Sequence, residues 1–449
     1  MKKQGFYPRL FALVLPIALQ NLMSAIVSAS DALMLGLLRQ DALSAVSLAS
    51  QVQFVLNLFY AALTIGATVL AAQYWGRNDT KTMQQLLAFV TRYACIVSVV
   101  FFLGAICIPE FLMKLFTSDT HLITLGAQYL RWVSPSYLCM GISQIYLCIM
   151  RNSGRTLRSS LYASSAVIIN IILNAILIFG LLGFPKLELL GAAIATVIAR
   201  IIELGLVLWE NHRDKSIVLQ LDMLFVKYTS LTKEYWRYCK PVMANEVIWG
   251  CGFTMFTVIL GHMGSDAIAA NSIANVAKNL IACFCLGIGG GSGIFIGNLL
   301  GQGALEDAKN TGSRLCHIAI YFGMISGVIV IVASPIILYI SSSLSSTAQD
   351  YLMGMLWICG YYMVGKSINS TVIAGIFCAG GDTRFGMMCD FVTMWIIIIP
   401  IGCIAAFLLD WPVLSVYFIL SLDEFVKLPA VYLHYRKYGW VKNLTMQQT

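Results

Sequence analysis

The chain has 449 residues, of which 59% are hydrophobic and only 11% are charged. A soluble globular protein carries roughly 25% charged residues because its surface must face water, so a soluble fold of this size is excluded. A transmembrane helix needs roughly 20 apolar residues, and the apolar share of this chain suffices for about twelve such helices. We therefore expect an all-α polytopic membrane protein.

Apolar runs separated by charged residues or by Gly and Pro predict twelve transmembrane helices. In chain order they are 10–37, 45–75, 84–107, 121–149, 159–184, 188–210, 238–262, 267–300, 314–340, 351–378, 386–409 and 412–434. The longest connection contains an amphipathic stretch and divides the chain into two halves of six spans. We expect an N-terminal lobe at 1–210, a cytoplasmic linker at 211–237 and a C-terminal lobe at 238–449.

The short connections between the predicted spans alternate in charge. One set, which includes both chain ends, holds twenty Lys and Arg residues, whereas the alternate set holds only Arg39, Lys114 and Lys186. The positive-inside rule places the basic set and both termini in the cytoplasm. The net charge of +8 then faces the anionic inner leaflet. This predicts a multi-pass protein of the plasma or inner membrane that needs no nucleic-acid partner.

The two halves resemble each other at a nearly constant shift. Residues that break helices or favour turns coincide at shifts of 225 and 227: Pro16 with Pro241, Gly66 with Gly291, Gly76 with Gly301 and Gly154 with Gly381. Because six spans is an even number, the second half enters the membrane in the orientation of the first. A parallel repeat of this kind predicts a substrate site between two lobes, and it favours a secondary transporter over a channel.

Asp31 is the residue in the predicted spans that most strongly indicates function, because charge inside a bilayer is costly. No basic residue lies near it along the first span. Asn170 and Asn174 share one face of the fifth span, and Thr196 lies at similar depth in the sixth. Carboxylate, amide and hydroxyl oxygens suit a small cation or a protonated acid. For the asparagines, a satisfied contact between helices stays an open alternative.

Other charges in the predicted spans have simpler explanations. Three pairs have the spacing of local ion pairs on a helix: Arg200–Glu203, Glu424–Lys427 and Asp423–Lys427. Asp390 lies about a turn from Arg384 and is expected near the membrane interface. Glu246, early in the seventh span, and Lys366, near the middle of the tenth, are candidate cavity residues of the C-terminal lobe. A pair between Glu246 and Lys366 would neutralise both charges.

The sequence contains no recognisable enzyme site. The Gly-rich stretch 286–293 lacks the ending of a phosphate-binding loop and is expected to permit close helix packing. The thirteen cysteines form no paired motif, and the five histidines form no HExxH motif or local pair. No nucleophile or metal constellation is visible. We expect neither catalysis nor an organic cofactor nor a structural metal.

Short motifs along the whole chain resemble the multidrug and toxic compound extrusion (MATE) family. Besides Pro16 and Asp31, they are AAQYWGRND (71–79), NIILN (170–174), GAAIATVIAR (191–200), ANEVIWGCG (244–252) and CAGGDTRF (378–385). The resemblance implies twelve helices in two lobes. It also implies export in exchange for protons or sodium.

Within the family, the resemblance implies specific roles for the residues that match its motifs. It implies a coupling site formed by Asp31, Asn170, Asn174 and Thr196, with sodium as the candidate metal, and a bend near Pro16. One departure bears on the C-terminal lobe. Glu246 matches an acid of one branch, but the acid that accompanies it there falls here at about Ser367, beside Lys366.

We therefore expect a secondary active exporter, an antiporter of amphipathic, cationic organic compounds coupled to proton or sodium influx by alternating access. It would work in the lipid bilayer as a monomer, with the coupling ion as its sole cofactor. The alternative is a lipid-linked oligosaccharide or lipid flippase of the same broader fold. A flippase should line its cavity with several Arg or Lys for pyrophosphate, and here mid-span cations are few.

Overall fold

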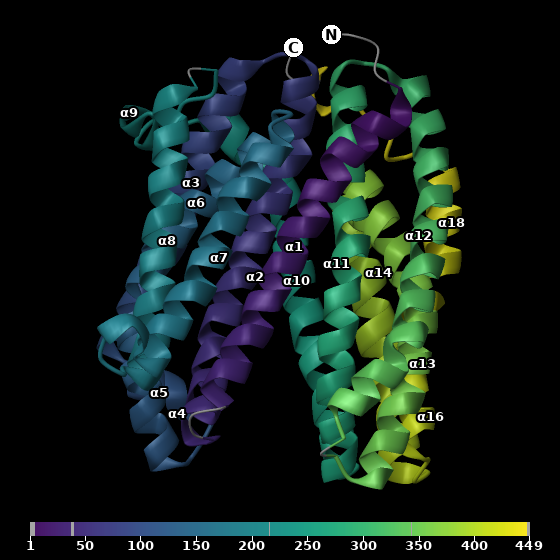
Figure 1. Cartoon of the computed structure of the whole chain (residues 1–449). Helices are drawn as coiled ribbons and strands as arrows, with labels where there is room; N and C mark the ends of the chain where they lie inside the picture. The colour runs from purple at the N-terminus through teal and green to yellow at the C-terminus, as the bar shows by residue number, and fades with distance from the viewer. Residues whose placement is uncertain (1–4, 37–39, 215, 343, 447–449) are drawn as a thin grey trace. The chain divides into compact units, whose positions relative to one another are not determined.

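A computed structural model describes residues 5–36, 40–214, 216–342 and 344–446 of the chain. These residues form helices joined by short turns, with no β-strand among them (Figure 1). The first half contains α1 (Phe6–Gly36), α2 (Gln40–Gly76), α3 (Thr80–Cys107), α4 (Pro109–Lys114), α5 (Thr120–Val133), α6 (Pro135–Asn152), α7 (Thr156–Phe179), α8 (Glu188–Arg213) and α9 (Leu221–Leu224). The second half contains α10 (Thr229–His262), α11 (Ser265–Gly301), α12 (Leu305–Ile340), α13 (Ser346–Asn369), α14 (Thr383–Phe391), α15 (Ile399–Cys403), α16 (Val413–Leu420), α17 (Asp423–Val426) and α18 (Leu428–Arg436).

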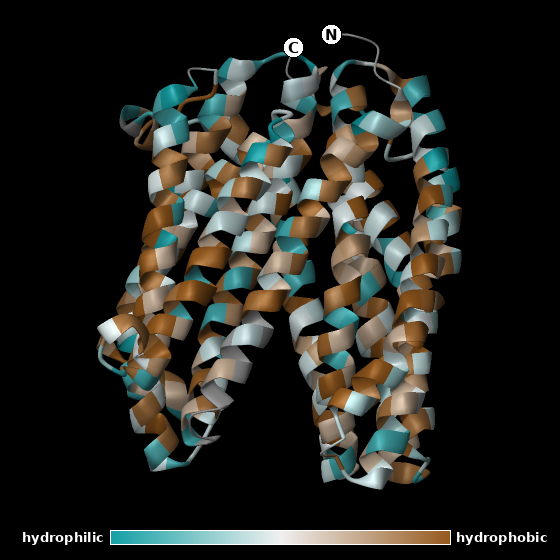
Figure 2. Cartoon of the chain, viewed as in Figure 1, coloured by the Kyte–Doolittle hydropathy of each residue, from teal (hydrophilic) through white to brown (hydrophobic). Residues whose placement is uncertain are grey.

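Most of the helices have the length and composition of membrane spans. Within the described residues nine helices are long and apolar enough to cross a bilayer, and α5 with α6, which meet at a 50° bend, would form a tenth. Hydrophobic residues dominate the middle of the long helices, while hydrophilic ones gather near many of their ends (Figure 2). The expected all-α polytopic fold is confirmed.

Four predicted spans are interrupted, and one of them is 386–409, where π-helical stretches at Val392–Ile398 and Ile404–Leu408 alternate with α14 and α15. The span predicted at 121–149 is two helices that meet at Ser134, because Pro135 has no backbone N–H to continue the helical hydrogen bonds. Span 351–378 is α13 followed by a π-helical stretch, Ser370–Phe377, and span 412–434 is α16, α17 and α18. These last two are not among the helices that are long and apolar enough to cross a bilayer. They hold most members of a cluster of charged side chains described below.

The repeat is visible in the helix boundaries. Helices α2 and α11 are both 37 residues long, and the shift that pairs Pro16 with Pro241 carries both ends of α2 onto the ends of α11. The same shift carries the start of α3 onto the start of α12. The shift that pairs Gly154 with Gly381 carries the start of α7 onto that of α14. The expected internal repeat is therefore confirmed at the level of whole helices.

The turns between these helices repeat as well. The left-handed backbone conformation occurs at matching positions of the two halves: Asn78 (φ 62°) with Gly303 (φ 76°), Gly154 with Gly381 (both φ 77°), and Gly183 (φ 82°) with Asp410 (φ 49°). Gly and Asn or Asp are the residues that adopt this conformation with least strain. The repeat is thus encoded in turn chemistry as well as in apolar length.

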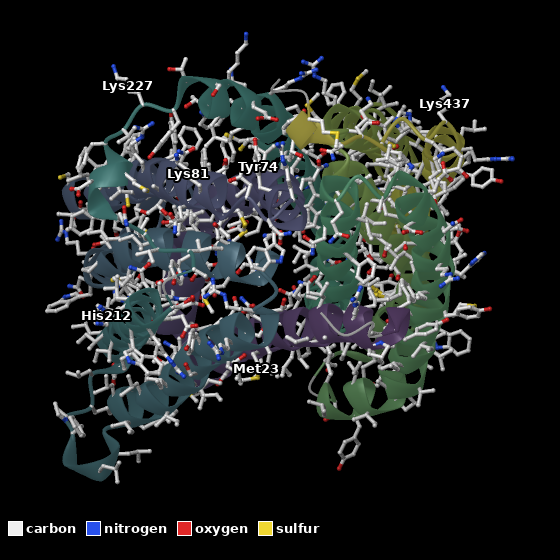
Figure 3. The ribbon with its side chains drawn as sticks, turned by 90° about the horizontal axis from the view of Figure 1, so that it is seen from above. Met23, Tyr74, Lys81, His212, Lys227 and Lys437 are labelled. Atoms are coloured by element: carbon white, nitrogen blue, oxygen red, sulfur yellow. The ribbon has the colours of Figure 1, made fainter. Side chains whose placement is uncertain are left out.

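By packing, the described chain forms two compact units. One consists of Met1–Leu22, Thr68–Arg77 and Trp236–Thr449, and the other of Met23–Ala67 and Asn78–Tyr235. In Figure 3 the side chains of Lys437, in the first unit, and Lys227, in the second, point away from the helices of their own unit. The proposed lobes at 1–210 and 238–449, with their linker, stay a prediction.

The Gly-rich stretch 286–293 lies within α11, where it allows close contacts. A Cβ atom on Gly287 or Gly291 would fall 2.6 Å from side-chain atoms of Ala18 or Val14 in α1. A Cβ on Gly289 would lie 2.6 Å from the carbonyl oxygen of Ser370. Such distances leave no space for a side chain, so the expected role in helix packing is confirmed.

The predicted amphipathic linker contains the single-turn helix α9. The Arg92 guanidinium of α3 donates hydrogen bonds to the carbonyl oxygens of Leu224 (3.4 Å) and Val226 (3.3 Å). Between these two residues, Phe225 is 85% exposed. The segment is therefore fastened to α3 through its backbone while its aromatic side chain points outward.

Candidate functional site

A chain of neutral hydrogen bonds joins α7 to α8 in the first half. The Asn174 amide donates to the side-chain oxygen of Asn170 (3.2 Å), and the Asn170 amide donates to the Thr196 hydroxyl (3.3 Å). The Thr196 hydroxyl donates to the carbonyl oxygen of Ala192 one turn earlier (2.9 Å). Both asparagines are buried. The structure thus brings together three of the four residues predicted from their depth.

Asp31, the fourth residue, lies in α1, but its side chain is outside the described residues. Its part of α1, from Met23 onward, belongs to the same compact unit as α7 and α8. Pro16 lies in the interior of α1, which runs from Phe6 to Gly36, and its repeat partner Pro241 lies within α10. A hinge at Pro16 stays a prediction.

The first-half charges near this chain are locally paired. The Arg200 guanidinium lies 2.6 Å from the carboxylate of Glu203, one turn later on α8. Glu203 is fully buried, so this pair removes the cost of leaving its charge unpaired. The expected local ion pair is confirmed.

The second half contains a buried ionic cluster made of Lys366, Asn369, Asp390, Glu424 and Lys427. Glu424 accepts from Lys366 (3.2 Å), from Lys427 (3.0 Å) and from the Asn369 amide (2.8 Å). Lys427 also lies 2.8 Å from Asp390. With two lysines and two carboxylates, this ionic cluster is formally neutral.

The ionic cluster differs from the expected pairings in three ways. Lys366 pairs with Glu424, and the structure gives Glu246 no ion pair within its described residues. Asp390 is buried against Lys427 instead of reaching the membrane interface. The expected Glu424–Lys427 pair is present, but Asp423 makes no ion pair with Lys427. The predicted Asp423–Lys427 pair assumed an unbroken helix, but α17 is a single turn that ends before Lys427. Of the two acids, Glu424 is therefore the one that contacts Lys427.

At the equivalent turn of each half, a charged residue forms an ion pair, with a residue at the C-terminal end of α8 in the first half and with a residue of α18 in the second. Arg155 forms an ion pair with Asp214 and lies 3.9 Å from Glu210 of α8. Asp382, which occupies the position of Arg155 in the repeat, lies 2.5 Å from His434 of α18. The sign of the charge at this turn is reversed between the halves, while the contact is kept.

Asp214 lies just beyond the end of α8, outside the predicted span. Partial burial raises its pKa, but hydrogen bonds from Ser216 and the nearby guanidinium groups of Arg155 and Arg158 outweigh that effect and lower the pKa overall. Asp214 therefore stays ionised and anchors the turn before α7.

A permanent metal site finds no support in the described residues, where no group of three or more His, Cys, Asp or Glu side chains is placed to hold a metal ion. All thirteen cysteines carry free thiols. The oxygen donors that the structure brings together are the neutral ones of Asn170, Asn174 and Thr196. Such a set suits weak, reversible binding of a small cation better than permanent coordination.

The family model named MatE matches the chain twice, over residues 16–176 and 241–404. The chain belongs to the MatE family. The two matched segments begin at Pro16 and Pro241, which are equivalent positions of the internal repeat. The family is one of membrane transporters, so the expectation of a transporter and not an enzyme is confirmed.

Relatives of this MatE protein match most of its length at low identity. It is 23% identical to the "probable multidrug resistance protein NorM" of Thermotoga maritima, covering 88% of this chain and 84% of the relative. It is 24% identical to the "uncharacterized transporter YisQ" of Bacillus subtilis, covering 96% and 95%. The outward-facing structure of a multidrug resistance MATE family transporter matches with a TM-score of 0.88 at 16% identity, covering 96% and 95%. This last likeness shows the twelve-helix, two-lobe fold.

Sequence reasoning did not foresee how the second-half charges join into one network. Lys366 of α13 pairs with Glu424 of α17, and Asp390 of α14 pairs with Lys427, so no spacing rule within one helix connects them. One signal was present. The tenth predicted span contains Lys366, and the twelfth contains Asp423, Glu424 and Lys427. Charged side chains are costly inside a bilayer unless they pair with opposite charges on neighbouring helices.

Proposed function

We propose that this MatE protein is a secondary active antiporter that exports amphipathic organic compounds bearing a cationic group in exchange for protons or sodium. The observation that carries the proposal is the hydrogen-bonded chain from Asn174 through Asn170 to Thr196. It lies in the compact unit that also contains the Asp31 segment of α1. An acid placed beside neutral oxygen groups can bind a proton or a small cation and release it again.

In this proposal Asp31 binds the coupling ion from outside. The loss of its negative charge weakens substrate binding and biases α1 at Pro16, so that the protein returns to the inward-facing state. Because coupling between two binding sites is reciprocal, the substrate in turn weakens ion binding. We place the protein in the plasma or inner membrane with cytoplasmic termini and expect it to work as a monomer.

The ionic cluster argues against the lipid-linked oligosaccharide flippase. Binding a pyrophosphate group calls for several cations facing the cavity. Here Lys366 and Lys427 are each held by a carboxylate within 3.2 Å. They are therefore neutralised within the protein, which leaves too few unpaired cations to hold a pyrophosphate.

The test is efflux of a fluorescent organic cation from proteoliposomes, driven separately by a pH gradient and by a sodium gradient. We expect one gradient to drive efflux by the wild type, and Asp31→Asn to abolish the response. Asp222→Asn, which alters an exposed acid of α9, is the matched control and should leave efflux unchanged. Efflux by Asp31→Asn at the wild-type rate, or no response of the wild type to either gradient, would contradict the proposal.

A further inference from the structure

A pocket within the second half is lined by two opposite charges that do not pair with each other. Lys278 of α11 and Asp423 of α17 both line it, together with residues of α10, α13 and α16. Lys278 and Asp423 form no ion pair, which means that their charged atoms are more than 4 Å apart. The charges of the ionic cluster already neutralise one another, so Lys278 and Asp423 each lack an ion-pair partner among the described residues.

Lys278 is held by aromatic rings instead of a carboxylate. Its ammonium lies 5.3 Å from the ring centroid of Phe253 and 5.0 Å from that of Tyr362. Cation–π contacts of this kind compensate only part of the cost of removing a lysine from water. The ammonium can therefore still donate hydrogen bonds to an anionic group of a ligand.

Asp423 presents the complementary group. Only 3% of the residue is exposed, and its Oδ1 atom is buried without a hydrogen-bond partner in the described structure. A buried carboxylate oxygen left unpaired is costly and calls for an explanation. The two lysines that contact the neighbouring Glu424, Lys366 and Lys427, already pair with Glu424. Asp423 can therefore accept a hydrogen bond from a ligand.

The rest of the pocket suits an aromatic ligand with polar groups. Trp249 and Phe253 of α10 stack with ring centroids 5.7 Å apart and planes 15° apart, offering a flat apolar wall. Asn271, Asn275 and Lys278 follow one another at the spacing of successive helical turns and so project from one face of α11. This face offers amide groups beside the lysine.

We propose that this pocket binds a zwitterionic aromatic compound, with its anionic group on Lys278 and its cationic group on Asp423. The pocket then recognises two charges of opposite sign in one molecule. The hydrogen-bonded chain of Asn174, Asn170 and Thr196, in contrast, offers only neutral groups. The inference rests on the proposed function for the role of the pocket in export. Binding itself requires no ion gradient, so it is tested independently.

The test measures equilibrium binding of four matched probes to the purified full-length protein in nanodiscs by calorimetry. The probes are phenylalanine, a zwitterion; phenylalaninamide, a cation; N-acetylphenylalanine, an anion; and N-acetylphenylalaninamide, which is neutral. We expect the zwitterion to bind most tightly, with about a tenfold loss for each charge removed, since hydrogen bonds to charged groups are the stronger kind.

Two variants assign each charge by the logic of a double-mutant cycle. Lys278→Gln should weaken binding of phenylalanine about tenfold and leave phenylalaninamide unchanged. Asp423→Asn should weaken phenylalanine similarly and leave N-acetylphenylalanine unchanged. Lys278→Arg keeps the charge and should retain most of the affinity. Lys309→Gln is the matched control, because Lys309 also lies over a tyrosine ring, 5.4 Å from that of Tyr438, but outside the pocket.

Three results would overturn the inference. They are equal affinity of the wild type for all four probes, no saturable binding of phenylalanine, and a loss in Lys278→Gln that is the same for every probe. Probe binding that follows the expected pattern in a protein without gradient-driven efflux would contradict the proposed function alone. Gradient-driven efflux with no charge discrimination would contradict this inference alone.

Discussion

The two halves of the chain share several helix boundaries but differ in the polar network that each places inside a membrane. In the first half, Asn174, Asn170 and Thr196 form a neutral chain between two helices. In the second, Glu424 and Lys366 belong to an ionic cluster in which every charge has an opposite partner. The repeat thus preserves backbone geometry at these helices, while side-chain chemistry is free to diverge wherever hydrogen bonds or ion pairs satisfy the polar groups.

The largest effect should come from removing the central acid of the ionic cluster. Glu424→Gln leaves Lys366 without an opposite charge and Lys427 with Asp390 alone. Breaking a buried ion pair by removing one partner costs about 3–5 kcal/mol. We expect the free energy of unfolding, measured by denaturant titration in micelles, to fall by that amount.

The first half supplies the comparison for this measurement. Asn170→Ala removes one hydrogen bond within α7 and one between α7 and α8, and hydrogen bonds between membrane helices average about 0.6 kcal/mol each. It should therefore destabilise the protein far less than Glu424→Gln. The double variant Glu424→Gln, Lys366→Met should recover part of the loss. Equal losses in the two halves would contradict the contrast between a neutral and an ionic network.

An intermediate effect should come from the repeated turn at Asn78 and Gly303, which share the left-handed conformation. Gly303→Val places a β-branched residue there and should cost about 1–2 kcal/mol. Gly303→Asn copies the first half and should cost much less, because a Cβ at this position would meet only the Met446 methyl group at 3.8 Å. Thermal unfolding of both variants checks this. A larger loss in Gly303→Asn than in Gly303→Val would show that the two turns are not equivalent.

The smallest effect should come from Asp214, which pairs with Arg155 at the turn where the second half has Asp382. Because the folded protein lowers the pKa of Asp214, the ionised side chain adds stability at neutral pH, and this is lost as pH falls below about 4. Asp214→Asn should cost about 0.2–1 kcal/mol at pH 7. The difference from wild type should shrink in acid. A difference that stays constant down to pH values of about 3 would contradict the role of this charge.

Much of the fold was predictable because membrane spans and turns leave local signals. Apolar length gave the helices, and the shift between Pro16 and Pro241 gave the repeat. The contact between Asn170 and Asn174 followed from their spacing on one helix. The partner of Lys366 was not predictable, since Glu424 comes from a distant segment whose helix is broken into three short pieces, α16, α17 and α18. Long-range pairing depends on packing, which spacing along the chain does not encode.

The most direct test of the account asks which half couples ion binding to substrate binding. The affinity of the purified protein for a fluorescent organic cation would be measured across pH and sodium concentration in wild type, Asp31→Asn and Glu246→Gln. We predict that the coupling ion weakens wild-type binding about 5- to 150-fold, the usual range for coupled sites. Asp31→Asn should abolish this ion dependence and Glu246→Gln should retain it. Full ion dependence in Asp31→Asn, or its loss in Glu246→Gln alone, would contradict the account.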